Sequence, residues 1–494
     1  MLTGCPPLTC TVGAVKIILS ATPQHGHLVP LLPLGRALRD RGNEVAVLTS
    51  AALRSAIEPE GLRLLPAGPS MDALLAERKA RTGTGPAGRP TPESVAELFA
   101  GVRIDLTADE ALAAAREFQP DLVVREICDY VGPIVAAARD VPMGTLALGP
   151  AMPPPIRAAL DSTARSRFTA RGLSAPSSTW HLDPCPPSLQ ADGWQRPDGW
   201  QPLRPEPHRG PGVPAPARLR SSARRRVLVT FGTFFNAPAV IAPLLRELVT
   251  LDIDVVVTLG LLADPGQFGI DHPRISFVPF TPLADLLRGI DAIVTHGGAG
   301  TTLAALSRGI PLVITPQGAD QFIQAERVAA AGAGIALLPG DATPLAVTAA
   351  MHALLSGASI SRAAAAIAQE IASMPDAVEV AAILDKGHGY VAIKSTVEKA
   401  DENACPLPIN GAAVTSMDAA PLVYDVDGPV FLPGDDAYVQ ECATRPGPGP
   451  RLLPGRGSAA GYRRWPSPAC SMASSHRPSP RCAAAPAPST RRRR

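Results

Sequence analysis

The stretch Thr295-His-Gly-Gly-Ala-Gly-Thr-Thr302 decides the fold of this chain. The apolar run that leads into it, Gly289-Ile-Asp-Ala-Ile-Val-Thr295, predicts a short buried strand, and Thr301-Thr-Leu-Ala-Ala-Leu-Ser-Arg308 predicts the first turns of a helix. The glycines between them predict a tight turn. A strand, a glycine turn and a helix N-terminus together indicate an α/β unit with an anion site at its turn.

The chemistry of such a turn favours phosphate. Glycine lets the main chain approach a phosphate closely, and the first helical turn presents free N–H groups and about half a positive charge of macrodipole. We expect the turn to bind through Gly298 and Gly300 and the helix start through the hydroxyls of Thr301 and Thr302. Glycines also serve close packing of a helix on a strand, so the cluster alone does not separate the two roles.

Polar residues around the turn favour a binding site. His296 stands at the strand exit, and Gln317-Gly-Ala-Asp320-Gln321 follows the next predicted strand, Ile310 to Pro316. The carboxyl ends of neighbouring parallel strands meet at one edge of a sheet, so these side chains are expected to converge. The combination indicates a pocket for a nucleotide-activated sugar.

Strand and helix alternate along two long stretches of the chain, which predicts two parallel sheets covered on both faces. In the first stretch, helices are predicted at Leu28 to Arg41, ended by Gly42, and at Gly132 to Arg139. The predicted strands are Val15–Ser20, Glu44–Thr49, Asp121–Val124, Met143–Leu148, Arg226–Phe231, Val255–Thr258, Ile275–Val278, Ala292–Val294 and Leu312–Ile314. We therefore expect an α/β protein with two Rossmann-like domains facing a cleft, where ligands bind.

Shifts in composition predict the domain boundaries. The stretch from Asp183 to Arg225 is rich in Pro, Gly and Arg, which suits an extended connection. Residues 443–494 consist mainly of Pro, Arg, Ser, Ala and Gly, which predicts a low-complexity, disordered tail. The expected parts are an extension at 1–14, a first domain at 15–205, a linker at 206–225, a second domain at 226–389 and the tail at 390–494.

Charge and cysteine usage narrow the class of protein. With 494 residues and a net charge of +2, the chain lacks the dense basic face of a nucleic-acid binder. None of its eight cysteines forms a Cys-x-x-Cys pair, so neither a zinc site nor a disulfide framework is indicated. We find no signal peptide and no apolar run near the ~20 residues of a membrane span, so we expect no integral membrane segment and a cytoplasmic protein.

Histidines follow the first predicted strand, in Ala21-Thr-Pro-Gln-His25-Gly-His27. A histidine has a pKa near neutrality and can accept a proton from an attacking hydroxyl. A lone histidine is more often structural, but two at a strand's carboxyl end favour catalysis. A carboxylate that holds the other ring nitrogen improves such a base, and Glu126 and Asp129 are the candidates. Each of the two could also be a solvated loop acid.

Taken together, these residues resemble the glycosyltransferase family that includes macrolide glycosyltransferases, plant secondary-metabolite glucosyltransferases and glucuronosyltransferases. The similarity is closest to the actinobacterial antibiotic-tailoring branch, covers about Val15 to Gly389, and is strongest from Asp291 to Leu338. Weaker matches are Gly26-His-Leu-Val-Pro30, Leu182-Asp-Pro-Cys-Pro-Pro187 and Thr230-Phe-Gly-Thr233.

The resemblance implies a GT-B architecture and a role for each matching residue. His27 matches the general base, and Glu126 falls at the place of its carboxylate partner. The positions that match contacts to the sugar donor are Gly232, Thr233, Val278, His296, Gly298, Gly300, Thr301, Gln317, Asp320 and Gln321. Among them, His296 and Thr301 match phosphate contacts, Asp320 and Gln321 the pair that holds the sugar hydroxyls, and the backbone near Val278 the part that reads the base.

The implied reaction is an inverting transfer from a UDP- or dTDP-sugar to a hydroxyl of a hydrophobic small molecule, such as a polyketide or macrolide aglycone. His27 would deprotonate the acceptor hydroxyl, and the nucleoside diphosphate would leave from the anomeric carbon. No metal and no other cofactor is expected. Asp252-Ile-Asp254 has the spacing of a metal-binding Asp-x-Asp, but it precedes a predicted strand and is interpreted as a solvated strand entrance.

Two segments depart from the family pattern. The segment from Pro150 to Thr179 is short for the acceptor-side helices, and Pro153-Pro-Pro155 disfavours a helix. The sequence therefore does not decide whether this segment forms a working acceptor site. In the tail, Asp427 to Tyr438 resembles the start of an FAD-linked oxidase, which we interpret as a remnant that binds no flavin. Two alternatives to transfer stay open: a non-catalytic nucleotide-sugar binder and a nucleotide-sugar epimerase.

Overall fold

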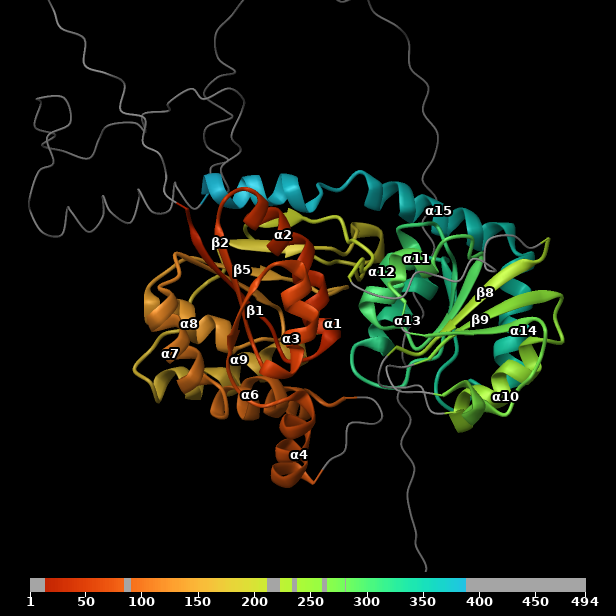
Figure 1. Ribbon diagram of the computed structural model, residues 1–494, viewed down its shortest axis with the longest axis horizontal. Coiled ribbons are helices and arrows are strands. Elements are labelled where there is room, and N and C mark those ends of the chain that lie inside the picture. The colour runs from red at the N-terminus through yellow and green to blue at the C-terminus, as the bar shows by residue number, and fades with distance from the viewer. Residues whose placement is uncertain are drawn as a thin grey trace, which may run out of the picture. The chain divides into compact units, whose positions relative to one another are not determined.

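Two parallel β-sheets form the framework of the protein in the computed structural model (Figure 1). The first sheet has seven strands in the order β3-β2-β1-β4-β5-β6-β7, and the second has six in the order β10-β9-β8-β11-β12-β13. The strand pairs in both sheets are parallel. The predicted fold class of two Rossmann-like domains is confirmed. The structure describes residues 14–83, 90–210, 223–232, 238–259, 264–279 and 281–387.

The first sheet is covered by helices on both faces. Its strands are β1 Lys16–Ser20, β2 Glu44–Thr49, β3 Arg63–Pro66, β4 Leu122–Glu126, β5 Met143–Leu146, β6 Trp180–Asp183 and β7 Trp200–Pro202. Helices α1 His25–Leu28, α2 Leu32–Asp40 and α3 Arg54–Ile57 cover one face, and α7 Ala108–Phe118 and α8 Val131–Arg139 cover the other (Figure 1). Burial on both faces explains why these strands are runs of Val, Ile and Leu.

Further helices of this half extend away from the sheet. They are α4 Met71–Thr82, α5 Pro92–Ala96, a π-helical segment Glu97–Val102, α6 Arg103–Asp105 and α9 Pro154–Thr169. The helix α5 and the π-helical segment pack against α9 through an apolar cluster that includes Ile104, Leu160 and Phe168.

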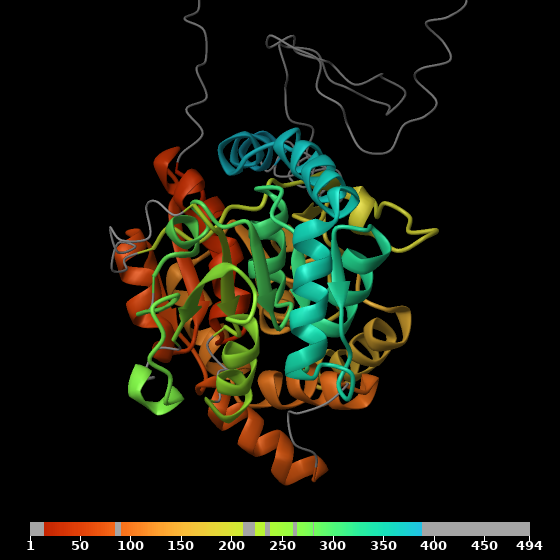
Figure 2. The ribbon, with the colours of Figure 1, turned by 90° about the vertical axis from the view of Figure 1, so that its right-hand side faces the viewer.

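The second sheet repeats the arrangement. Its strands are β8 Arg225–Thr230, β9 Ile253–Thr258, β10 Ile275–Val278, β11 Ala292–Thr295, β12 Leu312–Ile314 and β13 Gly334–Ala336. Helices α10 Pro238–Leu248 and α14 Pro344–Ser356 cover the face that is turned toward the viewer in Figure 2. The opposite face packs on α11 Leu283–Leu286, α12 Ala299–Leu306, α13 Gln321–Ala330 and α15 Ala358–Ala372.

Two expectations about the connecting segments are wrong. Within the expected extended connection after Asp183, β7 adds a strand to the first sheet, and Leu203 is buried. The segment expected to resist helix forms α9, with Pro153 as its N-cap. Proline is tolerated in a first helical turn because the N–H it lacks would have no helical partner there. Pro154 and Pro155 occupy those positions.

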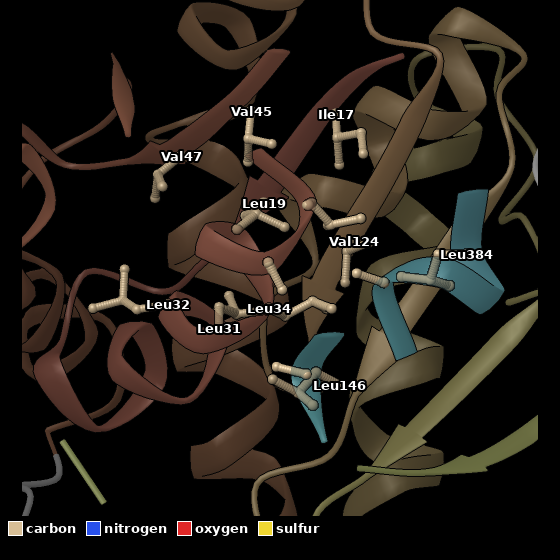
Figure 3. Packing of buried hydrophobic residues seen from close by; sticks show 14 of the residues in the cluster. Ile17, Leu19, Leu31, Leu32, Leu34, Val45, Val47, Val124, Leu146 and Leu384 are labelled. Carbon is tan, nitrogen blue, oxygen red and sulfur yellow. The ribbon is translucent and has the colours of Figure 1, made fainter. Parts of the chain in front are cut away.

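The chain returns to the first sheet at the end of its described part. Residues 377–387 are helical, and Ala377, Val380, Ala381 and Leu384 belong to the apolar core of the first sheet. Figure 3 shows Leu384 beside Val124 and Leu146. Asp385 accepts hydrogen bonds from Arg41 and Asn43. The last helical segment therefore contributes to the domain that the first 205 residues build.

No single helix in the described ranges has the length and apolarity to cross a bilayer, although the consecutive helices Pro344–Ser356 and Ala358–Gly387, bent by 75°, meet that criterion as a pair. Residues 1–13 of the expected extension and the expected tail at 390–494, with the oxidase-like stretch, lie outside the described residues.

Candidate active site

The two histidines of the first loop lie on a short helix. We expected a polar loop up to His27, but α1 begins at His25, because the N–H groups of His27 and Leu28 both donate to Gln24 O. Residues two apart on a helix point to different sides. Accordingly, His27 faces Glu126 at the end of β4, and His25 lies on another side of the helix, where burial lowers its pKa. The helix thus presents one histidine, not two, to the end of β4.

His27 forms an ion pair with Glu126. The distance from His27 Nδ1 to Glu126 Oε2 is 3.2 Å, and the Glu126 side chain is fully buried while that of His27 is 14% exposed. Glu126 is the last residue of β4, whereas the sequence placed it just after the strand. The carboxylate accepts hydrogen bonds from Thr22 N at 3.2 Å and Cys128 N at 2.7 Å. These contacts fix the carboxylate against the imidazole.

Asp129 belongs to a separate buried network. Its carboxylate accepts hydrogen bonds from Ser20 Oγ at 2.5 Å and Gly132 N at 2.8 Å, and it pairs with Arg103 Nη2 at 3.3 Å. Arg103 is itself fully buried and also donates to Ala21 O. Of the two carboxylates that the sequence left open, Glu126 is therefore the one in contact with His27.

The electrostatic interaction between His27 and Glu126 shifts the pKa of each residue. Burial acts to lower the pKa of His27, but the Glu126 charge, with smaller contributions from Asp320 and Asp129, outweighs it and raises that pKa. Burial likewise acts to raise the pKa of Glu126, but His27 and the hydrogen bonds from Thr22 and Cys128 outweigh it and lower that pKa. The carboxylate stays charged and favours an imidazolium beside it.

An aromatic ring covers the imidazole. The ring centroids of Phe99 and His27 lie 5.5 Å apart with an interplanar angle of 42°. Phe99 lies on the π-helical segment Glu97–Val102. Such segments are rare and occur often at functional sites. The imidazole of His27 thus has an apolar aromatic neighbour.

On the second sheet, His296 lies in a space that two glycines keep open. A Cβ on Gly232 would lie 2.9 Å from His296 Cε1, and one on Gly298 would lie 2.8 Å from His296 Nε2. Gly232 also has φ +68°, which favours glycine. Burial lowers the pKa of His296 to about 4, so the ring is neutral near pH 7. The ring of His296 therefore brings no full positive charge to this turn.

The helix after this turn begins earlier than expected. Gly298 is the N-cap of α12, so Gly300 and Thr301 lie in its first turn, where N–H groups have no partner within the helix. A Cβ on Gly300 would meet nothing within 4 Å, so the main chain is open to approach there. Thr301 is half-buried, but Thr302 is fully buried and its Oγ1 has no partner. The expectation that Thr302 adds a donor to the site is wrong.

The loop from Gln317 to Gln321 is held by one of its own side chains. Gln321 Oε1 accepts hydrogen bonds from Gln317 N at 2.7 Å and Gly318 N at 3.1 Å, and Gln321 is 3% exposed. Ala319 has φ +53°, a strained value for a residue with a Cβ. The strained turn ends at Asp320, which is exposed. Gln321 thus shapes the loop through its side-chain oxygen.

Asp320 is exposed, yet enough protein surrounds it to affect its charge. The surrounding protein displaces solvent and so raises the pKa of its carboxyl, opposed by a hydrogen bond from Gln324 and by the charge of His27. Gln324 Nε2 donates to Asp320 Oδ2 at 3.3 Å. The same amide meets the loop after β5, because a Cβ on Gly149 would lie 2.2 Å from Gln324 Nε2. The charges of Asp320 and His27 therefore act on each other's pKa.

Three positions singled out in the sequence remain: Val278, Thr233 and Asp252-Ile-Asp254. Val278 is buried at the end of β10, and its carbonyl accepts from Leu259 N. Since β9 and β8 separate β10 from β11, Val278 lies roughly 14 Å from the strand end before His296. Thr233 lies outside the described residues. Asp254 lies within β9, and Asp252 pairs with Arg224 at 2.6 Å.

Three possible metal ligands meet at the His27–Glu126 pair. The ligand atoms of His27, Glu126 and Cys128 all lie within 4.8 Å of one another. Burial raises the pKa of the Cys128 thiol well above its usual value, so the thiol is protonated near pH 7.

Three residues of this region were not predicted from the sequence: Phe99, Gln324 and Gly149. Phe99 stands in an apolar run whose π-helical turn leaves no pattern in the sequence. Gln324 follows Asp320 at the i, i+4 spacing that brings two side chains together on a helix, which was a usable signal.

Two family models together match most of the described residues. The model of the erythromycin biosynthesis protein CIII-like N-terminal domain matches residues 36–232, and that of the C-terminal domain matches residues 242–386. The L-demethylnoviosyl transferase of Streptomyces niveus is 35% identical over 361 residues, which cover 69% of this chain and 90% of that protein.

Solved structures share the architecture. The glycosyltransferase SsfS6 of a Streptomyces species, complexed with thymidine diphosphate, has a TM-score of 0.64 and 28% identity and covers 75% of this chain and 99% of its own. The spinosyn rhamnosyltransferase SpnG, complexed with spinosyn aglycone, has a TM-score of 0.63 and 25% identity and covers 75% of this chain and 100% of its own.

Proposed function

The chain belongs to the erythromycin biosynthesis protein CIII-like family of glycosyltransferases, and we propose that it transfers a sugar from a thymidine or uridine diphosphate donor to a hydroxyl of a polyketide or macrolide aglycone, with inversion. The observation that carries this proposal is the buried Glu126 carboxylate 3.2 Å from His27, with Asp320 near enough to couple to the same imidazole. A base and a sugar-holding carboxylate in this arrangement serve direct displacement.

His27 acts through the ring nitrogen that is turned away from Glu126. Nδ1 faces the carboxylate and carries the proton, so Nε2 is left to accept the proton of the acceptor hydroxyl. The acceptor oxygen then bonds to the anomeric carbon as the bond to the diphosphate oxygen breaks. The two charges on the His27–Glu126 pair offset each other as the imidazolium forms.

The departing diphosphate is bound by the start of α12. Its first-turn N–H groups and helix dipole stabilise the growing charge beside the neutral ring of His296. Asp320 and the amide of Gln321 hold the sugar hydroxyls, and the end of β10 near Val278 lies on the side of the base.

A cytoplasmic location is part of the proposal. Cys128 and Cys185, the cysteines of the described ranges, are free thiols, as is usual in a reducing compartment.

The test is transfer from thymidine and uridine diphosphate sugars to a panel of polyketide aglycones, followed by mass spectrometry and by NMR of the new glycosidic bond. We expect a glycoside whose anomeric configuration is opposite to that of the donor. Donor binding without product on any acceptor would favour the non-catalytic binder, and conversion of the donor sugar in the absence of acceptor would favour the epimerase.

A further inference from the structure

We propose that His27, Glu126 and Cys128 form a binding site for a thiophilic divalent cation, for which Zn²⁺ is the probe, and that the bound cation reversibly blocks transfer. The binding itself is independent of the proposed function, whereas the inhibition rests on it. The three side chains offer one imidazole nitrogen, one carboxylate oxygen and one sulfur, all within 4.8 Å of one another.

The spacing of the ligand atoms is close to that of a tetrahedral zinc site. Zinc binds nitrogen and oxygen at about 2.0–2.2 Å and sulfur at about 2.3 Å, which requires ligand atoms roughly 3.3–3.7 Å apart. The distance from His27 Nδ1 to Glu126 Oε2 is already 3.2 Å. Because no pair of the three exceeds 4.8 Å, the thiol needs to move by only about 1 Å to complete the set.

Hydrogen bonds from neighbouring residues hold the Glu126 carboxylate in place and still leave it lone pairs that can bind a cation. Glu126 Oε1 accepts from Thr22 N, and Oε2 accepts from Cys128 N, which links the carboxylate to the backbone of the residue that carries the thiol. Hydrogen bonds from residues that do not themselves bind the metal orient the metal ligands in this way. His27 Nδ1 and Glu126 Oε2 lie 3.2 Å apart, so a cation would take the place of the proton between them.

Charge and ligand type select the cation. One carboxylate and one thiolate balance the two charges of Zn²⁺, and the thiol releases its proton to solvent as the metal–sulfur bond forms. Thiolate and imidazole suit zinc, whereas Mg²⁺ prefers an all-oxygen octahedron. Cys128 is partly exposed, so the cation can reach it.

A cation on Nδ1 would remove the base. The neutral imidazole would then carry its proton on Nε2, where it meets the acceptor hydroxyl with an N–H group and no lone pair. Glu126 would be shared with the cation and could no longer stabilise an imidazolium. Inhibition should therefore lower kcat for every acceptor.

The test uses the full chain, and Cys128→Ser is compared with Cys185→Ser as the matched control, because Cys185 is also a free thiol but is buried elsewhere. Zn²⁺ affinity is measured by competition with a chromophoric chelator. We expect one zinc equivalent to bind at least about tenfold more weakly in Cys128→Ser, since loss of even an outer contact has such an effect. The Cys185→Ser protein should bind like the wild type.

Inhibition is then measured relative to the zinc-free rate of each variant. We expect Zn²⁺ to inhibit the wild type and Cys185→Ser, EDTA to restore the rate, and Mg²⁺ to have no effect. Equal zinc affinity in the wild type and Cys128→Ser would overturn the site. If zinc binds at this site and the rate of transfer does not fall, the proposed inhibition is wrong. If no transfer is found in any protein, the chelator competition still decides the binding and the failure belongs to the proposed function.

Discussion

Glu126 Oε2 lies 3.2 Å from His27 Nδ1, and the carboxylate is fully buried while the imidazole is not. A buried acid therefore lies against an imidazole that is still partly accessible. Burial acts to lower the pKa of His27, but the combined effect of Glu126, Asp320 and Asp129 outweighs it and raises that pKa.

The pH profile should therefore depend on Glu126. Only neutral His27 accepts a proton, so kcat/KM should rise with pH through an apparent pKa above 6.5, the ordinary value for the imidazole. In Glu126→Gln the attraction is lost and burial remains, so that pKa should fall and the rising limb should move to lower pH. The plateau rate should also drop, because the imidazolium loses its partner. If the rising limb of the pH profile stays at the same pH in Glu126→Gln, Glu126 does not control the pKa of His27.

Gly232 should be required for diphosphate binding. A Cβ there would lie 2.9 Å from the His296 ring, so Gly232→Ala should displace His296 and weaken thymidine diphosphate by about tenfold or more. Gly172→Ala is the matched control, since Gly172 has a similar φ of +66° but an open Cβ position. Both variants should lose stability, on the order of 1 kcal/mol, and calorimetry should find weaker binding only in Gly232→Ala. Equal binding in both would contradict the role of the His296 contact.

The two threonines of α12 should behave differently. Thr301→Val removes a hydroxyl at the open end of the helix and should weaken the diphosphate, since a lost hydrogen bond to a charged group is worth about 1.5–3 kcal/mol. Thr302 Oγ1 is buried without a partner, so Thr302→Val should leave binding unchanged and keep or raise the Tm. Isothermal titration with thymidine diphosphate and thermal unfolding measure both effects. Stronger loss of affinity in Thr302→Val would reverse the assignment.

Gln324 should act on the sugar through Asp320. Its amide donates to Asp320 at 3.3 Å and helps to keep the pKa of that carboxyl from rising further. Gln324→Ala and Asp320→Ala should both weaken the nucleotide sugar and leave thymidine diphosphate unaffected, with the larger effect in Asp320→Ala. Calorimetry with the two ligands separates these cases. An equal loss for both ligands would place these residues on the diphosphate instead.

The sequence predicted the parallel sheets because their strands, such as β2 and β12, are buried on both faces and therefore read as continuous apolar runs. It could not choose between Glu126 and Asp129, since that choice depends on Arg103, which pairs with Asp129 from a distant helix. The missed helix α9 and strand β7 gain their stability from tertiary packing, which overrides local preferences.

The central claim is that His27 is the base of the transfer, and the rate of His27→Ala tests it most directly. Its kcat should fall by roughly 10²- to 10⁴-fold, the usual contribution of proton removal, while the Kd for thymidine diphosphate stays within about twofold of the wild type. A His27→Ala protein that folds, binds the diphosphate and transfers sugar at the wild-type rate would contradict the account.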